Sequence, residues 1–272
     1  RGITMEVKNE KNIETLQQKL KELKEEELKE RVFETTSKGL IMQEFELPLG
    51  VFDGIKFYPR VILREMTGEE EDILVSRLPL SQKITMVLER TIVKFLARDD
   101  SELKPSSEII KRMSTNDRLA AFLYLRIVSL GSEYSFFTYC VFCNHKLYVN
   151  VDLNTLEILK VKDEDKAFEY KVELPSGHTV LCRVPDVLIE DKTMLTNLTA
   201  AMAMRIVQFD GKPPTFDDLK KLPMRDRVFL RQQFEKHEGG IDTTIEIVCH
   251  KCGNEFKTEI DFGQKSFFSL LT

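Results

Sequence analysis

The sequence predicts an α+β protein built from an internally duplicated unit, in which each copy combines short strands with helices and ends in a CxxC β-hairpin. The first observation is that residues 135–153 align without a gap with residues 244–262. The offset of 109 residues carries Cys140 onto Cys249 and Cys143 onto Cys252. Self-similarity at a fixed spacing is the sequence signature of repeated structural units.

Three shorter blocks repeat in the same order upstream of these segments. Asp117-Arg118 and Asp226-Arg227 keep the offset of 109. The other two pairs of blocks are similar at other offsets, Ile92–Phe95 with Ile206–Phe209 and Phe45–Gly50 with Val172–Gly177. Four blocks in one order favour a duplication, and recurrence by composition alone is the alternative.

A charged helical arm is expected in front of the duplicated part, over residues 1–39. Residues 12–34 are rich in Glu and Lys and contain neither Gly nor Pro. Ile13, Leu16, Leu20 and Leu23 follow a 3-4-3 spacing, which places them on one face of a helix. This face either packs back on the body of the protein or docks against a partner chain.

The body is expected to form two copies of one unit, over residues 40–153 and 168–272, with an acidic linker over residues 154–167. In each copy a strand enters a Leu-Pro-x-Gly turn, which we interpret as structural, and a second strand follows. These second strands are predicted over Phe57–Arg64 and Thr179–Val184.

Helices are predicted between the second strand and the hairpin of each copy. In the first copy, a helix capped by Ser114-Thr115-Asn116 is predicted to run to about Leu130. Its counterpart begins near Pro223 and ends at Gly239-Gly240. The remaining helices are predicted over Gly68–Arg77, Leu80–Leu96 and Glu190–Val207.

The two hairpins are predicted to bind one structural zinc ion per chain through their cysteines. These are Cys140, Cys143, Cys249 and Cys252. Two residues between the cysteines of a pair allow a tight turn to aim both sulfur atoms at one point, and Asn144 and Gly253 suit such a turn. Four thiolates around Zn²⁺ leave no open position, so the site would be structural and not catalytic. Because 105 residues separate Cys143 from Cys249, each copy is expected to supply half of the site.

Three other interpretations of these cysteines are open at this point. His145 and His250 would complete two separate partial sites, the CxxC pairs would be redox-active, or the thiols would bind no metal. The redox interpretation is weakened because thioredoxin-like motifs open a helix after a strand, whereas these pairs lie between strands. Cys182 is expected to be a buried thiol. His178 and His237 are isolated and are expected at the surface or in loops.

Composition and motifs argue against several classes of function. The net charge is −5 and the pI is near 5.6, whereas binding along nucleic-acid phosphates needs a basic surface, so no nucleic-acid partner is expected. The most apolar stretch, residues 119–130, is interrupted by Arg126 and is shorter than the about 20 residues that cross a bilayer, so no membrane partner is expected. No Walker-type loop, G-x-S-x-G or H-E-x-x-H motif is present, so neither catalysis nor a small-molecule substrate is expected. We interpret the two Asp-Arg pairs as structural.

Several segments resemble a family of tailed-phage baseplate proteins related to the central-hub component of T-even phages, with relatives in phage-like contractile particles. These segments are Phe45–Gly50, Val61–Leu74, Asp117-Arg118, Tyr134–Cys143 and Val151–Leu153. The resemblance covers about residues 40–155 and is most specific at Leu63–Gly68 and at the CxxC segment. The second copy matches more weakly, and the arm lies outside the resemblance.

The resemblance implies a non-enzymatic structural or assembly subunit of a contractile tail baseplate, at the hub or the hub-wedge connection. It implies other baseplate, hub and tail-tube proteins as partners in a multi-copy assembly, and a place in the virion after assembly in the host cytoplasm. The alternative from the double CxxC is a zinc-ribbon adaptor that binds nucleic acid or a regulatory protein. That alternative is weakened because the lysines near the cysteines are offset by acidic residues, namely Lys146, Lys251 and Lys257 by Glu255, Glu259 and Asp261.

Overall fold

The computed structural model describes residues 34–35, 39–186, 197–262 and 265–268, and it has the mixed α+β content that the sequence predicts. The chain divides into two compact units, residues 1–43 and 44–272. In the first unit, β1 (Glu34–Thr35) pairs antiparallel with the start of β2 (Ile41–Phe52). The predicted charged helix falls on residues 12–33, outside the described residues, while its last predicted residue, Glu34, lies in a strand.

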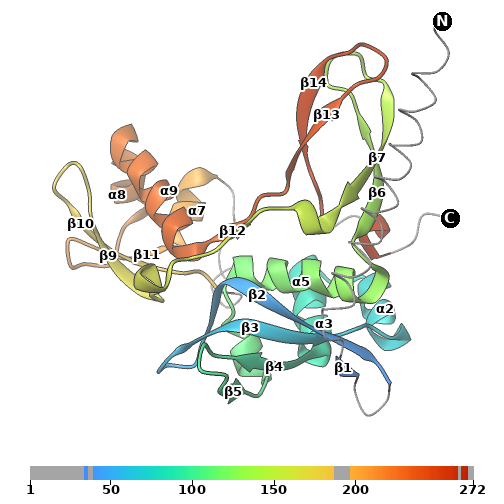
Figure 1. The fold of residues 1–272 in the computed structure, drawn as a ribbon. Helices are drawn as coiled ribbons and strands as arrows, with labels where there is room; N and C mark the ends of the chain where they lie inside the picture. Colours follow the sequence, from blue (N-terminus) through green and yellow to red (C-terminus); the bar gives the residue numbers. More distant parts are fainter. Residues whose placement is uncertain (1–33, 36–38, 187–196, 263–264, 269–272) are drawn as a thin grey trace, which may run out of the picture. The chain divides into compact units, whose positions relative to one another are not determined.

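A sheet with the strand order β2-β3-β4-β5 forms the first part of the second unit (Figure 1). Its further strands are β3 (Phe57–Arg64), β4 (Ile92–Leu96) and β5 (Glu102–Leu103). The helices of this part are α2 (Gly68–Val75), α3 (Leu80–Thr91), α4 (Ser107–Lys111) and α5 (Thr115–Leu130). Helix α5 packs on β3 and on α3, which places it between the sheet and the rest of the unit.

Helix α5 has the start and the end that the sequence predicts. The Ser114 side chain accepts the backbone N–H of Asp117 at 3.0 Å, which caps the first turn. At the other end Gly131 takes a φ of 82°, a conformation that glycine adopts without strain. Ten of its 16 residues are buried. Within the described ranges, no helix is long and apolar enough to cross a membrane.

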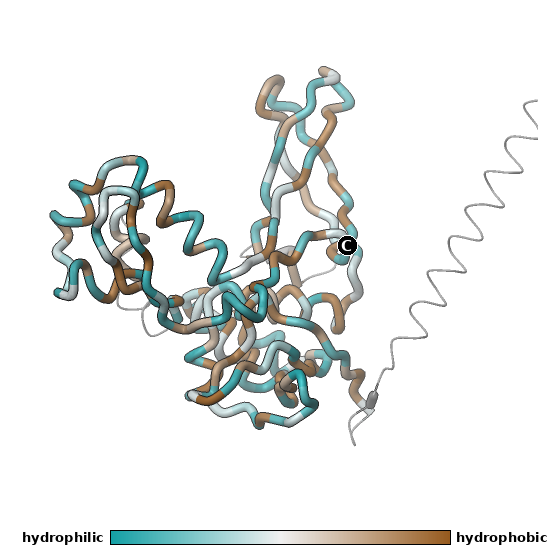
Figure 2. The backbone as a smooth tube through the Cα atoms, turned by 60° about the vertical axis from the view of Figure 1, so that its left-hand side comes forward, coloured by the Kyte–Doolittle hydropathy of each residue, from teal (hydrophilic) through white to brown (hydrophobic). Residues whose placement is uncertain are grey.

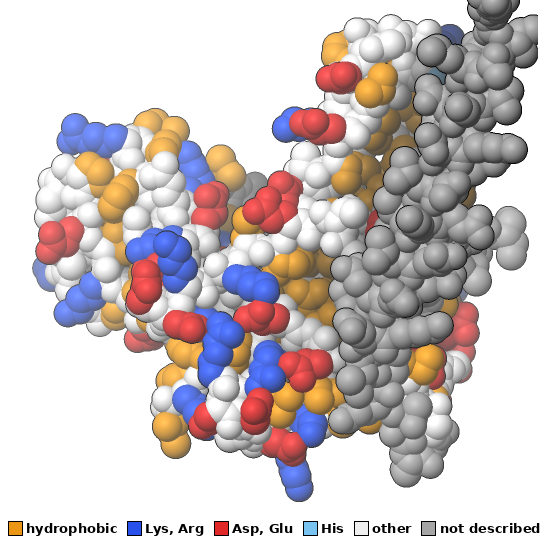
Figure 3. Space-filling model, in the orientation of Figure 1, with side chains coloured by type: hydrophobic (Ala, Val, Ile, Leu, Met, Phe, Trp, Pro, Cys, Tyr) orange, Lys and Arg blue, Asp and Glu red, His pale blue; other side chains and the backbone are white. Residues whose placement is uncertain are grey.

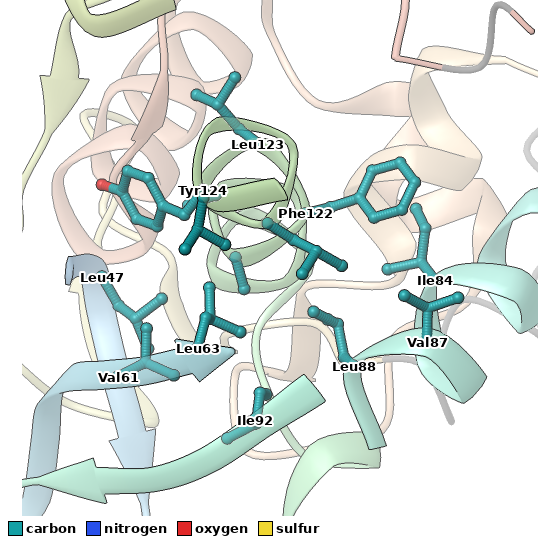
Figure 4. Packing of buried hydrophobic residues seen from close by; sticks show 14 of the residues in the cluster. Leu47, Val61, Leu63, Ile84, Val87, Leu88, Ile92, Phe122, Leu123 and Tyr124 are labelled. Carbon is teal, nitrogen blue, oxygen red and sulfur yellow. The ribbon is translucent and has the colours of Figure 1, made fainter. Parts of the chain in front are cut away.

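Aliphatic and aromatic side chains from the sheet, α3 and α5 form the main hydrophobic core (Figure 4). Phe122 of α5 points toward Ile84 and Val87 of α3, and Leu47 and Leu63 of the sheet lie beneath the helix. Full burial of one such side chain contributes about 1.5–3 kcal/mol. The position of α5 is therefore fixed by packing on two sides.

The helix predicted over Leu80–Leu96 is wrong for its last five residues. The helix ends at Thr91, and the residues that follow form β4, antiparallel to β3 with Phe95 opposite Val61. This pairing places Phe95 in the core with no exposed surface. The apolar spacing of this segment suits a helix as well as a strand, and only the partner strand decides between them.

A second sheet, with the order β11-β10-β9, carries its own core. Its strands are β9 (Glu169–Glu173), β10 (Thr179–Arg183) and β11 (Ile206–Phe209). The accompanying helices are α7 (Leu198–Ala203), α8 (Phe216–Lys221) and α9 (Met224–Glu238). The helix predicted over Glu190–Val207 is wrong at its end, because Ile206 and Val207 lie in β11, and its first residues lie outside the described part.

Two antiparallel strand pairs carry the CxxC segments (Figure 1). The first strand pair is β6 (Glu133–Tyr139) with β7 (Lys146–Asp152), and the second strand pair is β13 (Thr244–Val248) with β14 (Glu255–Glu259). Hydrophobic and hydrophilic residues alternate along these strands (Figure 2). In the chain between the first and the second strand pair, β8 (Ile158–Leu159) pairs with β12 (Gly240–Ile241). Three short 3-10 helices complete the described elements, Leu153–Thr155, Asp163–Asp165 and Lys265–Phe268.

Candidate metal centre

The four CxxC cysteines converge at the ends of the two strand pairs. All four Sγ atoms lie within 4.8 Å of one another. The Sγ atoms of Cys140 and Cys252 are 3.7 Å apart, and those of Cys143 and Cys249 are also 3.7 Å apart. Each strand pair thus contributes two sulfur atoms to one cluster, and residues more than 100 positions apart in the sequence share one site.

Two turns of the same geometry aim these sulfur atoms. In the first turn, the Cys140 N–H donates to the His145 carbonyl at 2.9 Å and the Asn144 N–H donates to the Cys140 carbonyl at 2.8 Å. In the second turn, the corresponding bonds run from Cys249 to Asn254 at 2.9 Å and from Gly253 to Cys249 at 2.8 Å. Asn144 and Gly253 both take a positive φ, 53° and 72°, which Asn and Gly tolerate best.

The sulfur geometry fits a tetrahedral metal ion. Four sulfur atoms placed about 2.3 Å from a zinc ion at the corners of a tetrahedron would lie about 3.8 Å from one another. Two of the six distances between sulfur atoms, 3.7 Å each, agree with that edge length, and all six are within 4.8 Å. A disulfide needs a much shorter distance of about 2.05 Å. The four cysteines can therefore hold a metal ion through all four sulfur atoms.

The pKa values of Cys249 and Cys143 are shifted in opposite directions within the cluster. Burial acts to raise the pKa of Cys249, but backbone N–H groups of Cys252 and Lys251 outweigh it and lower the pKa to about 7. A backbone hydrogen bond at His145 acts to lower the pKa of Cys143, while burial and the neighbouring sulfur atoms raise it to about 12. One thiol of the cluster thus ionises readily and the next resists ionisation, because it would place a second negative charge beside the first. A bound cation removes this conflict, since it stabilises every thiolate.

A small apolar cluster supports the sulfur atoms from inside the strand pairs. Its buried members are Cys140, Cys249, Leu147 and Phe256. Cys252, by contrast, is exposed. With only four buried residues, this cluster is far smaller than either sheet core.

The two histidines near the cysteines contact each other. The Nε2 atoms of His145 and His250 are 3.0 Å apart, and their rings meet edge to face. Among the described residues, the cluster of ligand atoms contains the four cysteines and neither histidine. The geometry thus brings the sulfur atoms into one group instead of two partial sites.

The remaining cysteine and histidines lie elsewhere. Cys182 is buried in the core of the second sheet, where burial raises its thiol pKa to about 12. His178 is exposed and its Nδ1 lies 2.7 Å from Asp210 Oδ2. The Nδ1 of half-buried His237 lies 2.7 Å from the Asp165 carbonyl oxygen.

The aspartates of the two Asp-Arg pairs accept hydrogen bonds from backbone amides. Asp117 is fully buried and accepts the N–H groups of Leu49 at 2.9 Å and of Gly50. Burial raises the pKa of Asp117 to about 6, against the opposing effect of these two N–H groups. Asp226, also fully buried, accepts the N–H of Ser176 at 3.2 Å. Asp117 therefore fastens the Leu47–Gly50 segment to α5, and Asp226 fastens the Leu174–Gly177 turn to α9. The turn predicted at Leu47–Gly50 is wrong, because this segment continues as part of β2, which pairs with β3.

One buried structural residue was not assigned a role from the sequence. Arg126 of α5 donates to three main-chain carbonyls, those of Phe267 at 2.7 Å, Gly131 and Glu133. It thereby joins α5, the start of the first strand pair and the last described segment. Its place inside an apolar run was the only signal in the sequence.

A comparison with known proteins gives the family. No curated protein and no solved structure matches the chain. A family model for the T4 bacteriophage base plate protein matches residues 58–269, most of the chain, including both strand pairs and all four cysteines of the cluster. The match confirms the resemblance that the sequence motifs indicate. The chain belongs to the T4 bacteriophage base plate protein family.

Proposed function

We propose that the protein is a non-enzymatic structural or assembly subunit of a contractile phage tail baseplate, at the hub or the hub-wedge connection. The observation that carries this proposal is the family match over residues 58–269. The partners would be other baseplate, hub and tail-tube proteins in a multi-copy assembly. The protein would be assembled in the host cytoplasm and reside in the tail baseplate of the virion.

The proposed role of the cysteine cluster is to hold one structural zinc ion. Four sulfur ligands at tetrahedral spacing support zinc, which favours such sites, and they leave no position for a substrate or a reactive water. The ion would join the two strand pairs, whose own apolar cluster is small. A structural ion at this place would stiffen the two strand pairs of a baseplate subunit.

Two observations support a role other than catalysis. The carboxylates of Asp117 and Asp226 are buried and bind backbone amides, so neither has the access to solvent or substrate that a general acid or base needs. If the four thiolates share one zinc ion, they fill all of its coordination positions, and none is left for a substrate or a water molecule.

An internal duplication would explain the arrangement of the two halves. The five residue pairs of β13 and β14, from Thr244 opposite Glu259 to Val248 opposite Glu255, are the pairs of β6 and β7 shifted by 109. The orders β2-β3-β4 and β9-β10-β11 match, and each half has a buried aspartate bound to its Leu-Pro-x-Gly segment. We therefore retain copies over residues 40–153 and 168–272, a linker over 154–167 and an arm over 1–39 as the proposed organisation.

The surface charge supports a protein partner over nucleic acid. On the face shown in Figure 3, basic and acidic side chains are interspersed and no continuous basic patch forms. Lys257, beside the second CxxC segment, pairs with Glu246 at 3.1 Å. Salt-sensitive binding of DNA or RNA by the purified protein would favour the zinc-ribbon adaptor instead.

The decisive experiment is a deletion in the phage or particle that encodes the chain, combined with protein mass spectrometry of purified particles. We expect the wild-type chain in the baseplate, and no complete baseplates after deletion. Absence of the chain from wild-type particles together with normal assembly after deletion would refute the proposal. Metal analysis of the purified chain should give about one zinc per chain, because two half-sites share one ion.

A further inference from the structure

The first strand pair carries an exposed aromatic face. Phe137, Tyr139 and Tyr148 remain 48%, 56% and 54% exposed. Phe137 and Tyr148 are opposite each other across the strands, with ring centroids 5.0 Å apart. In the turn that follows β6, Val141 and Phe142 are also exposed, at 69% and 62%. We call these five residues the aromatic face.

The second strand pair shows that the fold does not require these aromatic residues. Shifting Phe137 and Tyr148 by 109 positions gives Glu246 and Lys257, which are also opposite each other. This pair forms an exposed ion pair of 3.1 Å. The same strand geometry is therefore stable with a charged pair, and the exposed aromatic pair needs another explanation.

We propose that the aromatic face is the contact surface for another protein of the baseplate, a partner with an apolar surface that carries an acidic side chain. This inference rests on the proposed function and names the chemistry of the partner. Large exposed apolar patches on soluble proteins mark interaction sites, and aromatic residues dominate the energetic centres of interfaces.

The area of the aromatic face argues against self-association as its role. Five side chains, each about half exposed or more, offer roughly 500 Å², taking about 200 Å² for a complete aromatic side chain. Two copies that met through this face alone would bury roughly 1,000 Å² in total, below the about 1,200–2,000 Å² of a stable interface. The face is large enough to be the apolar centre of a wider contact with a different protein.

The charges around the aromatic face specify an acidic partner. Lys146 lies opposite Tyr139, and its ammonium group lies 4.1 Å from the centroid of the Phe137 ring. Within the described part of the chain, no carboxylate pairs with Lys146. The acidic residues Glu133 and Asp152 lie at the other end of the same strands. A single cation within an apolar surface fits one carboxylate of a protein, whereas a nucleic acid would need several.

Site-specific photo-cross-linking in assembled particles tests the contact directly. A photo-reactive phenylalanine analogue replaces Tyr148 in one variant and Lys257, its counterpart in the second strand pair, in the control. We expect irradiation to join position 148 to a second baseplate protein, at a peptide that contains an acidic residue, and to give no such product at position 257. A product with another copy of this chain, with residues 1–33 of the same chain or with nucleic acid, or no product, would overturn the proposal.

An exchange of the two pairs tests the energetic role. Phe137→Glu combined with Tyr148→Lys places the ion pair of the second strand pair on the first, and Glu246→Phe combined with Lys257→Tyr is the matched control. We expect both variants to keep the wild-type melting temperature. Only the first should enter particles poorly, with binding weakened about 30-fold or more, as for loss of a central aromatic contact.

The outcomes separate this inference from the proposed function. If the wild-type chain is required for assembly but the Phe137→Glu, Tyr148→Lys variant enters particles normally, only the aromatic face is refuted. If the wild-type chain is itself absent and dispensable, the baseplate role fails first.

Discussion

Replacing Cys252 by serine should remove the metal ion and loosen the outer halves of both strand pairs. Cys252 is the exposed member of the cluster, so the change of one atom has little effect on packing and reports on the metal. Cys182→Ala is the control, because Cys182 lies in the core of the second sheet, away from the cluster. It should lower stability without changing the metal content.

The size of the effect follows from the length of chain that is freed when the strand pairs open at their outer ends. Tyr134 and Leu153 stay in the main core, so only the short strand segments between the core and the cysteines are freed. In the chain-entropy account, a cross-link that closes a loop of about 15 residues contributes about 3 kcal/mol. Without the metal ion, little stability remains at the outer ends of the strand pairs. Only the four buried residues of the small apolar cluster hold these ends together, and an isolated strand pair is marginally stable in water.

Amide hydrogen exchange followed by mass spectrometry measures this effect along each strand. Without metal, exchange at Leu147, Ile247 and Phe256 should accelerate by about 100-fold or more, the equivalent of about 3 kcal/mol. Exchange at Tyr134 and Leu153 should change little, because both are buried in the main core. Chelation of the wild type should reproduce the pattern. Uniform exchange along the strands in a metal-free Cys252→Ser variant would refute the reasoning.

Three further predictions concern stability, measured by urea denaturation. Gly50→Ala should cost about 1–3 kcal/mol more than Gly177→Ala. Both glycines have positive φ, but a Cβ at Gly50 would lie 2.7 Å from the Pro59 Cα, whereas a Cβ at Gly177 would face open space. Equal losses of stability in the two variants would contradict the steric argument. Arg126→Met should cost roughly 2–4 kcal/mol because three carbonyls lose their donor, and a cost below about 1 kcal/mol would contradict it. Burial raises the pKa of Asp117 to about 6, so the folded state holds this proton more tightly than the unfolded chain. The contribution of this carboxyl to stability should therefore fall by about 2 kcal/mol as the pH rises from 4 to 7, and Asp117→Asn should abolish that part of the pH dependence.

The sequence was sufficient where local signals agree with the tertiary contacts. The capping segment Ser114-Thr115-Asn116 and the apolar run that follows predict α5 closely, and β3 matches its predicted range. The prediction was wrong at Ile92–Leu96, because the choice of strand over helix depends on pairing with β3, a partner about 30 residues away. The start of the predicted helix over Glu190–Val207 lies outside the described residues, and its end fails for the same reason, since β11 pairs with β10.

The candidate site divides in a similar way. The CxxC spacing and the offset of 109 residues select four cysteines that the fold does bring together. The aromatic face was not predicted, although Phe137 and Tyr139 alternate with buried Tyr134 and Phe136 in the sequence order expected for a strand. Alternation in the sequence shows that a strand has two faces, but it does not show which face is buried. The face with Phe137 and Tyr139 is exposed because the rest of the fold covers the other face.

The order in which the cysteines are synthesised has a consequence for folding in the cell. At about 5–20 residues per second, the ribosome needs roughly 5–20 seconds after Cys143 to reach Cys249, which lies 106 positions later. During that interval the first two thiols have no partners for a four-sulfur site, and they are open to oxidation or to transient binding of other metals. A metal ion bound by all four sulfur atoms can enter only after both halves have left the ribosome. Binding of the metal ion would therefore be a late step of folding. Chains from interrupted translation would lack the second pair of cysteines, and their first strand pair would remain accessible to proteases.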